Sequence, residues 1–222
     1  EWTEAIDIIR GLGVKRIVLL GGEVTEYEDL AGVVDYITNK SKLECSLTTN
    51  GFNNYEKVKE LITNGFMNIA VSIDTLDVRT SISRRKCESS LGLVKRLEED
   101  KLKDAINLRS YTVVSKRNID TLEDFIKNMT QRGIKVYLLP YHWGNEGVFE
   151  HRKNSDEVAF TTDKDVEVYQ RCIDRIVKLK REGYLIDNSE EYLLATKRHI
   201  KKLDWKCEGL SELRIDSDGS LL

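Results

Sequence analysis

The sequence predicts an α/β protein in which a parallel sheet is covered by helices, and two observations predict it. Short runs of β-branched and aliphatic residues alternate with amphipathic helical stretches from the first residue to about residue 140. The chain also has 222 residues and 40% hydrophobic content, which is enough to bury one sizeable core.

The expected elements follow one another as helix and strand. We expect a helix over 2–12, ended by Gly13, and further helices at 29–39 and 55–63, one ending near residue 102, and one from residue 122 to Gly133. The strands that they feed are expected at 15–20, 43–48, 68–73, 105–114 and 134–139. No strand precedes the first helix, although a βαβ crossover needs one, so we expect a missing strand upstream.

The part after Pro140 is organised differently. A long polar and aromatic loop is expected over 141–162, and its His142, Trp143, Asn145 and Glu146 are open to either ordinary packing or substrate contact. Helices at 163–181 and 190–202 follow, and then a tail over 207–222 with a short strand and turn.

The distribution of charged and apolar residues limits which partners we expect. The 35 basic and 38 acidic residues are spread along the chain and give a net charge of −3, so we expect no nucleic-acid partner. No apolar run approaches the roughly 20 residues of a membrane span, and no signal-peptide pattern opens the chain, so we expect no membrane and a cytoplasmic location. The four cysteines form no C-x-x-C pair; Cys45 and Cys172 are expected to be buried, whereas Cys87 and Cys207 stay open.

Three of the expected strands end in residues that suit ligand binding, since ligands of parallel α/β folds meet the carboxyl ends of the strands. The first ends in Gly21-Gly22-Glu23, where glycines permit close approach and a carboxylate can pair with a cation. The second ends in Thr49-Asn50-Gly51 and the third in Ser72-Ile73-Asp74, whose serine and aspartate share one face and can grip a ribose diol. Each triplet alone also fits an ordinary turn or a solvated strand end.

Taken together, GGE, TNG and SID in this order, one βα unit apart, resemble the radical S-adenosylmethionine (SAM) superfamily, as does Thr112-Val113-Val114 followed by Asn118. The resemblance covers residues 1 to about 140. It implies a partial (β/α)6 TIM-like barrel with parallel strands over 1–200, lacking the first strand and the cluster loop. It further implies that the full-length enzyme cleaves SAM reductively to a 5′-deoxyadenosyl radical, which abstracts hydrogen from a substrate, whereas this fragment alone is inactive.

The resemblance also implies roles for single residues. Gly21, Gly22 and Glu23 correspond to the contact with the methionine ammonium of SAM, Thr49 and Asn50 to the rim beside it, and Ser72 and Asp74 to the ribose contact. Ser110 corresponds to a contact with the methionine carboxylate, for which Arg84 and Arg85 are weaker candidates. The segment from Leu139 to Tyr141 corresponds to the backbone edge beside adenine.

The iron–sulfur ligands are where the sequence departs from the family. The C-x-x-x-C-x-x-C loop that ligates a 4Fe–4S cluster is absent from the 222 residues, so we expect its cysteines outside them. Residues 201–222 resemble the start of a SPASM or Twitch extension, which makes Cys207 a candidate ligand of an auxiliary cluster. That tail suggests a peptide substrate, and the family implies an electron donor such as flavodoxin or ferredoxin.

Two alternative functions stay open at this point. One is a degenerate, non-catalytic barrel that binds SAM or another nucleotide, and the cysteines of the complete gene distinguish it from the enzyme. The other is an unrelated aldolase or phosphate-binding enzyme, which needs a catalytic lysine at a strand end or a phosphate-binding glycine loop; we find neither in the sequence.

Overall fold

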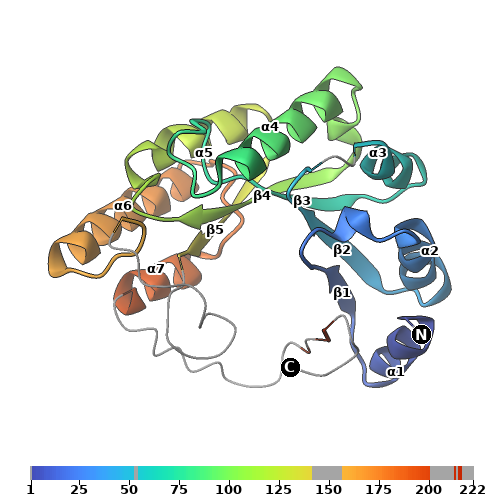
Figure 1. The fold of residues 1–222 in the computed structure, drawn as a ribbon. Helices are drawn as coiled ribbons and strands as arrows, with labels where there is room; N and C mark the ends of the chain where they lie inside the picture. The colour runs from blue at the N-terminus through green and yellow to red at the C-terminus, as the bar shows by residue number, and fades with distance from the viewer. Residues whose placement is uncertain (1, 53–54, 142–156, 201–212, 214, 217–222) are drawn as a thin grey trace.

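The fold is a single curved sheet with helices on its outer side. The computed structural model describes residues 2–52, 55–141, 157–200, 213 and 215–216. Within them, five parallel strands are ordered β1-β2-β3-β4-β5. They are β1 (Arg16–Leu19), β2 (Glu44–Thr49), β3 (Asn68–Ser72), β4 (Asn107–Val114) and β5 (Lys135–Pro140). Figure 1 shows the strands forming an arc, the partial barrel that the sequence predicted.

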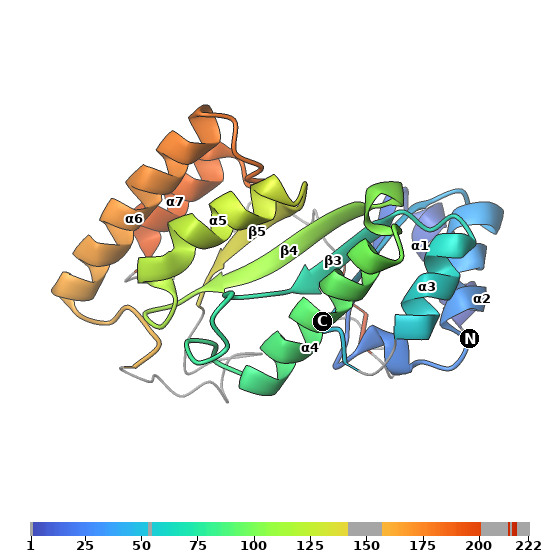
Figure 2. The same cartoon turned by 90° about the horizontal axis from the view of Figure 1, so that it is seen from above.

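A helix lies in each crossover between neighbouring strands, as the alternating sequence pattern requires. These are α2 (Leu30–Asp35), α3 (Tyr55–Thr63), α4 (Arg84–Glu99) and α5 (Leu122–Gln131), while α1 (Trp2–Gly11) precedes β1, and α6 (Asp163–Arg181) and α7 (Glu190–His199) follow β5. Short 3₁₀ turns are η1 (Val24–Glu26), η3 (Lys103–Ala105) and η4 (Ile119–Thr121), and a π-helical turn, η2 (Tyr36–Lys40), continues α2. Figure 2 shows α3, α4 and α5 side by side along the outer side of the sheet.

The helix-facing side of the sheet forms the core. Leu47, Val71 and Val136 on this side are each 0% exposed. In α5, Phe125 and Met129 lie one turn apart on the buried stripe, and each such side chain contributes about 1.5–3 kcal/mol when removed from water. The amphipathic spacing that predicted the helix therefore also attaches it to the sheet.

The opposite side of the sheet is its concave face. Side chains alternate along a strand, so residues adjacent to the buried set in sequence point to the other side. The strand register places Ser72 beside Tyr111, and Tyr111 beside Tyr137, on this side. The concave face includes Thr48, Ala70, Ser72, Arg109, Tyr111 and Tyr137.

The outer edge of β5 is paired with an irregular segment. Val136 donates its N–H to the Leu185 carbonyl and accepts from the Asp187 N–H, both at 2.8 Å, and Val136 and Ile186 form an isolated parallel bridge. The Asn188 amide then accepts from the Leu138 N–H at 2.7 Å and donates to the Leu138 carbonyl at 3.0 Å. The Asn188 side chain thereby provides the backbone hydrogen bonds to β5 that a further strand would otherwise make.

Element boundaries shift by one to three residues from the prediction, and the helix expected over 29–39 divides into α2 and η2. At the other edge, β1 is the terminal strand of the sheet among the described residues, as expected for a barrel without its first strand. His142, Trp143, Asn145, Glu146 and Cys207, and most of the extension expected over 201–222, lie outside the described residues. In the described part, no helix has the length and apolar character needed to cross a bilayer.

Candidate cofactor-binding site

Glu23 connects the carboxyl ends of β1 and β2. Its Oε1 accepts hydrogen bonds from the Thr25 N–H at 3.2 Å and from the hydroxyls of Thr25 and Thr49, both at 2.6 Å. Among the described residues, its Oε2 accepts one hydrogen bond, from the Asn50 N–H at 2.7 Å. The GGE and TNG segments therefore meet, as the sequence predicted, and Oε2 retains capacity for another donor.

No lysine or arginine in the described part pairs with the half-buried Glu23 carboxylate. All its donors are neutral N–H and O–H groups. They fix the position of the negative charge without cancelling it. Such a carboxylate is suited to a ligand cation with N–H donors.

Gly21 and Gly22 precede this carboxylate in an exposed turn. Neither is among the glycines with positive φ, and a Cβ built on either would meet no atom within 4 Å. Neither backbone conformation nor internal packing thus requires glycine here. Close approach of a ligand to the backbone is a physical reason for glycine that agrees with both observations.

Gly51 allows the Thr49-Asn50-Gly51 segment to pack closely against α4. Its φ is +72°, and a Cβ would lie 2.8 Å from the Ser89 carbonyl oxygen and 2.9 Å from the Ser90 Cα. The Ser90 hydroxyl donates to the Asn50 carbonyl at 2.8 Å. Thr49 is only 2% exposed, so it supports Glu23 and has little surface for a ligand.

Ser72 and Asp74 lie at the end of β3, the strand next to β2. Asp74 Oδ1 accepts the Val113 N–H at 2.9 Å and so continues the pairing of β3 with β4. Burial raises the pKa of Asp74, although the Val113 N–H and nearby Lys86 oppose this. Oδ2 has no hydrogen-bond partner in the described part, which leaves it open to a hydroxyl donor.

Asn118 fastens the ends of β3 and β4 to each other. Its buried amide donates to the carbonyls of Asp74 and Val113 at 2.7 and 2.9 Å and accepts the Ser115 N–H at 2.9 Å. Asp74 therefore has a fixed backbone on both sides of its carboxylate. The sequence indicated Asn118 only by resemblance, whereas its hydrogen bonds explain what it does.

The expectation for Ser110 requires correction. The register pairs Ser110 with Val71 on the helix-facing side of the sheet, where Ser110 is 0% exposed. Its hydroxyl lies 3.3 Å from that of Thr112, which donates to the Ile73 carbonyl. Ser110 therefore belongs to the buried layer and not to the rim, because the alternation along β4 places it opposite the ligand side.

The remaining rim residues lie near the ends of β4 and β5. Leu139 is paired with Val113 and shares its side of the sheet. The Tyr141 N–H donates to the Val114 carbonyl at 2.9 Å, so the backbone edge expected beside adenine continues past Pro140. The weaker candidates for the methionine carboxylate are engaged elsewhere: Arg84 pairs with Glu88, and Arg85 lies over the Phe52 ring at 4.2 Å.

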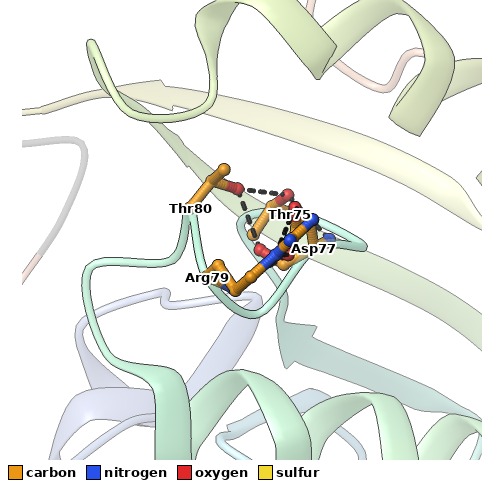
Figure 3. A network of polar contacts seen from close by, with 4 residues as sticks. All are labelled: Thr75, Asp77, Arg79 and Thr80. Carbon is orange, nitrogen blue, oxygen red and sulfur yellow. Dashed lines mark hydrogen bonds and ion pairs between the residues drawn. The ribbon is translucent and has the colours of Figure 1, made fainter.

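The loop from β3 to α4 is braced by its own polar groups, as Figure 3 shows. Arg79 donates to both oxygens of Asp77, and its side chain and backbone N–H lower the pKa of Asp77 to about 2. The hydroxyls of Thr75 and Thr80 are 2.9 Å apart, and Thr80 also donates to the Asp77 carbonyl. The loop that follows Asp74 therefore has a defined shape.

The described cysteines do not fit a metal cluster. Cys45, Cys87 and Cys172 are all buried, and no group of three or more potential metal-ligating side chains occurs in the described part. Burial raises the pKa of the Cys45 and Cys172 thiols to about 12, and burial likewise raises the pKa of Cys87. Cys87 is thus buried like the other two, at 1% exposure, which answers the question left open about its surroundings.

A model of the Radical SAM superfamily matches residues 1–142. Since this is more than half of the chain, the protein belongs to the radical SAM superfamily, a class of enzymes whose cofactors are SAM and a 4Fe–4S cluster.

Two relatives of this chain are named as GTP 3',8-cyclases. A GTP 3',8-cyclase of Peptoclostridium acidaminophilum is 27% identical over 228 residues, which cover 100% of this chain and 68% of the relative. A GTP 3',8-cyclase of Clostridium perfringens (strain SM101 / Type A) is 44% identical over 69 residues, 29% of this chain and 20% of the relative.

Solved structures show the same fold. "Native anSMEcpe with bound AdoMet" has a TM-score of 0.54 at 17% identity and covers 84% of this chain and 54% of that one. The form with AdoMet and Cp18Cys peptide has a TM-score of 0.52 at 16% identity, with 83% and 54% covered. The chain thus spans about half the length of the structures that it matches.

Sequence reasoning missed two supports of the site. Ser90, in the middle of α4, shows no local signal, because its role depends on contact with the distant Asn50 carbonyl. Thr25, two residues after Glu23, donates its N–H and its hydroxyl to the carboxylate of Glu23, which is the N-cap of η1.

Proposed function

We propose that this chain is the SAM-binding part of a radical SAM enzyme that acts on a nucleotide. The observation that carries the proposal is the Glu23 carboxylate, fixed by neutral donors from two strand ends and without a cationic partner in the described part. The methionine ammonium of SAM supplies the missing positive charge.

The residues that would hold SAM follow from their positions. Glu23 binds the ammonium, with the open backbone of Gly21 and Gly22 beside it. Ser72 and the Asp74 carboxylate receive the ribose hydroxyls, and the Leu139–Tyr141 backbone lies beside adenine. Thr49 and the Asn50 N–H act through Glu23, since both already bind its carboxylate. When bound, SAM would supply hydrogen-abstraction chemistry, once one-electron reductive cleavage had released methionine from it.

The 4Fe–4S cluster needs ligands from residues outside these 222, because the three-cysteine motif does not occur among them. Isolated, the chain is therefore expected to bind SAM without cleaving it. A cytoplasmic location and a flavodoxin or ferredoxin as electron donor belong to the same proposal. An auxiliary cluster at Cys207 also remains a proposal.

A nucleotide is the substrate class we favour, because a GTP 3',8-cyclase aligns with the whole chain. The peptide substrate suggested by the tail depends on a region outside the described residues. The peptide named with one solved structure carries no weight here, because that similarity shows the fold alone.

The test is SAM binding by isothermal titration calorimetry to the protein, Glu23→Gln and a matched control, Glu26→Gln. Glu26 is exposed and lies in the same short turn. Losing a charge-assisted contact of about 1.5–3 kcal/mol should weaken SAM binding roughly 10- to 150-fold in Glu23→Gln only. Equal affinity of Glu23→Gln and wild type, with both folded, refutes the proposed site.

A further inference from the structure

Two tyrosines stand side by side on the concave face, next to the proposed ribose contact. The register pairs Ser72 with Tyr111, and Tyr111 with Tyr137. The Tyr111 and Tyr137 ring centroids are 5.3 Å apart, and Tyr192 of α7 continues the row at 5.9 Å from Tyr137. The aromatic row thus begins one strand from Ser72 and runs across β4 and β5.

These rings differ from a tyrosine that only fills the core. Tyr169 of α6 is 1% exposed and packs on Phe160 with centroids 5.0 Å apart. Tyr111 and Tyr137 are instead only half-buried, so part of each ring stays accessible. A pure packing role would be expected to remove them from solvent as it does Tyr169.

The polar ends of the two rings also lack partners. In the described part, neither the Tyr111 nor the Tyr137 hydroxyl makes a hydrogen bond to protein, whereas partly buried phenols usually find one. Burial raises the pKa of Tyr137, with Tyr111 and Asp187 adding to the effect, so its phenol stays neutral. Both hydroxyls are therefore free to bind water or a ligand.

The side chains beside Tyr111 on β3 and β2 are small. Ala70 and Ser72 flank it on β3, and Thr48 is paired with Ala70 on the same face. The buried Thr48 Oγ1 has no hydrogen-bond partner in the described part. This half of the concave face thus offers little side-chain volume, and the Thr48 Oγ1 lies beneath its surface.

Charge does not dominate this surface. Arg109 precedes Tyr111 by two residues on the same face, but its guanidinium lies 3.2 Å from the Asp187 carboxylate. The cation closest to the rings along β4 is thus already paired. On β5, Lys135 is paired in register with Arg109 on this face and makes no ion pair in the described part, so flat aromatic surface, neutral hydroxyls and this one cation are available for recognition.

We infer that Tyr111 and Tyr137 form the stacking surface for the heteroaromatic base of the nucleotide substrate. A planar, hydrogen-bonding ring matches the exposed aromatic area and the free hydroxyls. Stacking of a base on an aromatic side chain is worth about 1–3 kcal/mol, enough to determine specificity. The inference rests on the proposed function, since it assumes that substrate occupies the concave face beside SAM.

The experiment uses the full-length holoenzyme without reductant, so that binding is measured without turnover. Equilibrium dialysis gives the Kd of GTP, ATP, CTP and UTP, and of ribose 5-phosphate as a probe without a base, while calorimetry gives the Kd of SAM. The variants are Tyr111→Leu, Tyr111→Phe, Tyr137→Leu and Tyr137→Phe, with Tyr27→Leu as control because Tyr27 is 46% exposed and lies away from the row.

Each leucine variant should weaken binding of the best triphosphate by about 5- to 150-fold, and each phenylalanine variant should stay within roughly threefold of wild type. Affinities for ribose 5-phosphate and SAM should not change in any variant. Leucine variants that bind the triphosphate like wild type overturn the inference. A wild-type enzyme that binds SAM but none of the triphosphates also overturns the inference, although such a result leaves the proposed SAM site supported. The SAM site is tested separately, by the loss of SAM binding in Glu23→Gln.

Discussion

Gly51→Ala is the substitution whose effect the structure specifies most closely. At φ +72° an alanine enters the left-handed region, which costs about 1–2 kcal/mol. Its Cβ would also lie 2.8 Å from the Ser89 carbonyl oxygen and 2.9 Å from the Ser90 Cα, both backbone atoms of α4. Relieving that overlap costs a further 1–3 kcal/mol, roughly, so the total loss is about 2–5 kcal/mol.

A loss of this size is measurable by urea unfolding and by thermal melting. For a domain of this length it corresponds to a fall in Tm of roughly 4–20 °C. Moving α4 away also breaks the 2.8 Å bond from the Ser90 hydroxyl to the Asn50 carbonyl. Because Asn50 donates its N–H to Glu23, SAM affinity should fall together with stability.

The matched control is Gly65→Ala. Gly65 has a φ of +91°, but a Cβ there meets no atom within 4 Å. It should show the backbone cost of about 1–2 kcal/mol and no change in SAM affinity. If Gly51→Ala destabilises the protein no more than Gly65→Ala does, close packing of this turn against α4 is not what requires glycine.

Three further substitutions test the supports of the rim. Thr49→Val removes the 2.6 Å hydroxyl donor to Glu23 and should lower the free energy of unfolding by about 1–3 kcal/mol in urea; no loss contradicts this. Asn118→Ala unpairs buried groups and should cost about 2–4 kcal/mol, with faster amide exchange at Ser115 as the local sign; unchanged exchange there counts against the role. Asp74 has a raised pKa in the folded state, so its ionisation opposes folding as the pH rises above 3.8. Asp74→Asn should therefore gain stability relative to wild type between pH 4 and 7 by chemical denaturation, and a relative loss over that range would reverse the assigned sign.

The fold was predictable from sequence because its elements are specified locally. The buried stripe of α5 and the alternation of β5 can both be read from residue order. The convergence of GGE and TNG was also predictable, since adjacent parallel strands end at the same edge of a sheet. The hydrogen bond from the Asn50 N–H to the Glu23 carboxylate is a consequence of this topology.

The errors and omissions have a common physical origin. Ser110 was expected at the rim because it is polar, but its face is set by the register with Val71, which the sequence does not state. Asn188 substitutes for a strand beside Leu138 through its side chain, and no pattern of strand residues announces this. Side-chain roles that depend on contacts distant in sequence are therefore what local patterns fail to predict.

Glu23 has two roles that a single substitution confounds, since its carboxylate holds β1 to β2 and would also bind the ammonium of SAM. Glu23→Gln removes the charge and keeps most of the shape, so it weakens binding more than folding. Thr49→Val keeps the charge and removes one support, so it weakens folding first. A carboxylate that is important only for structure would make both variants lose SAM affinity in proportion to their lost stability. A carboxylate that binds the ligand requires Glu23→Gln to lose more affinity than Thr49→Val at equal stability.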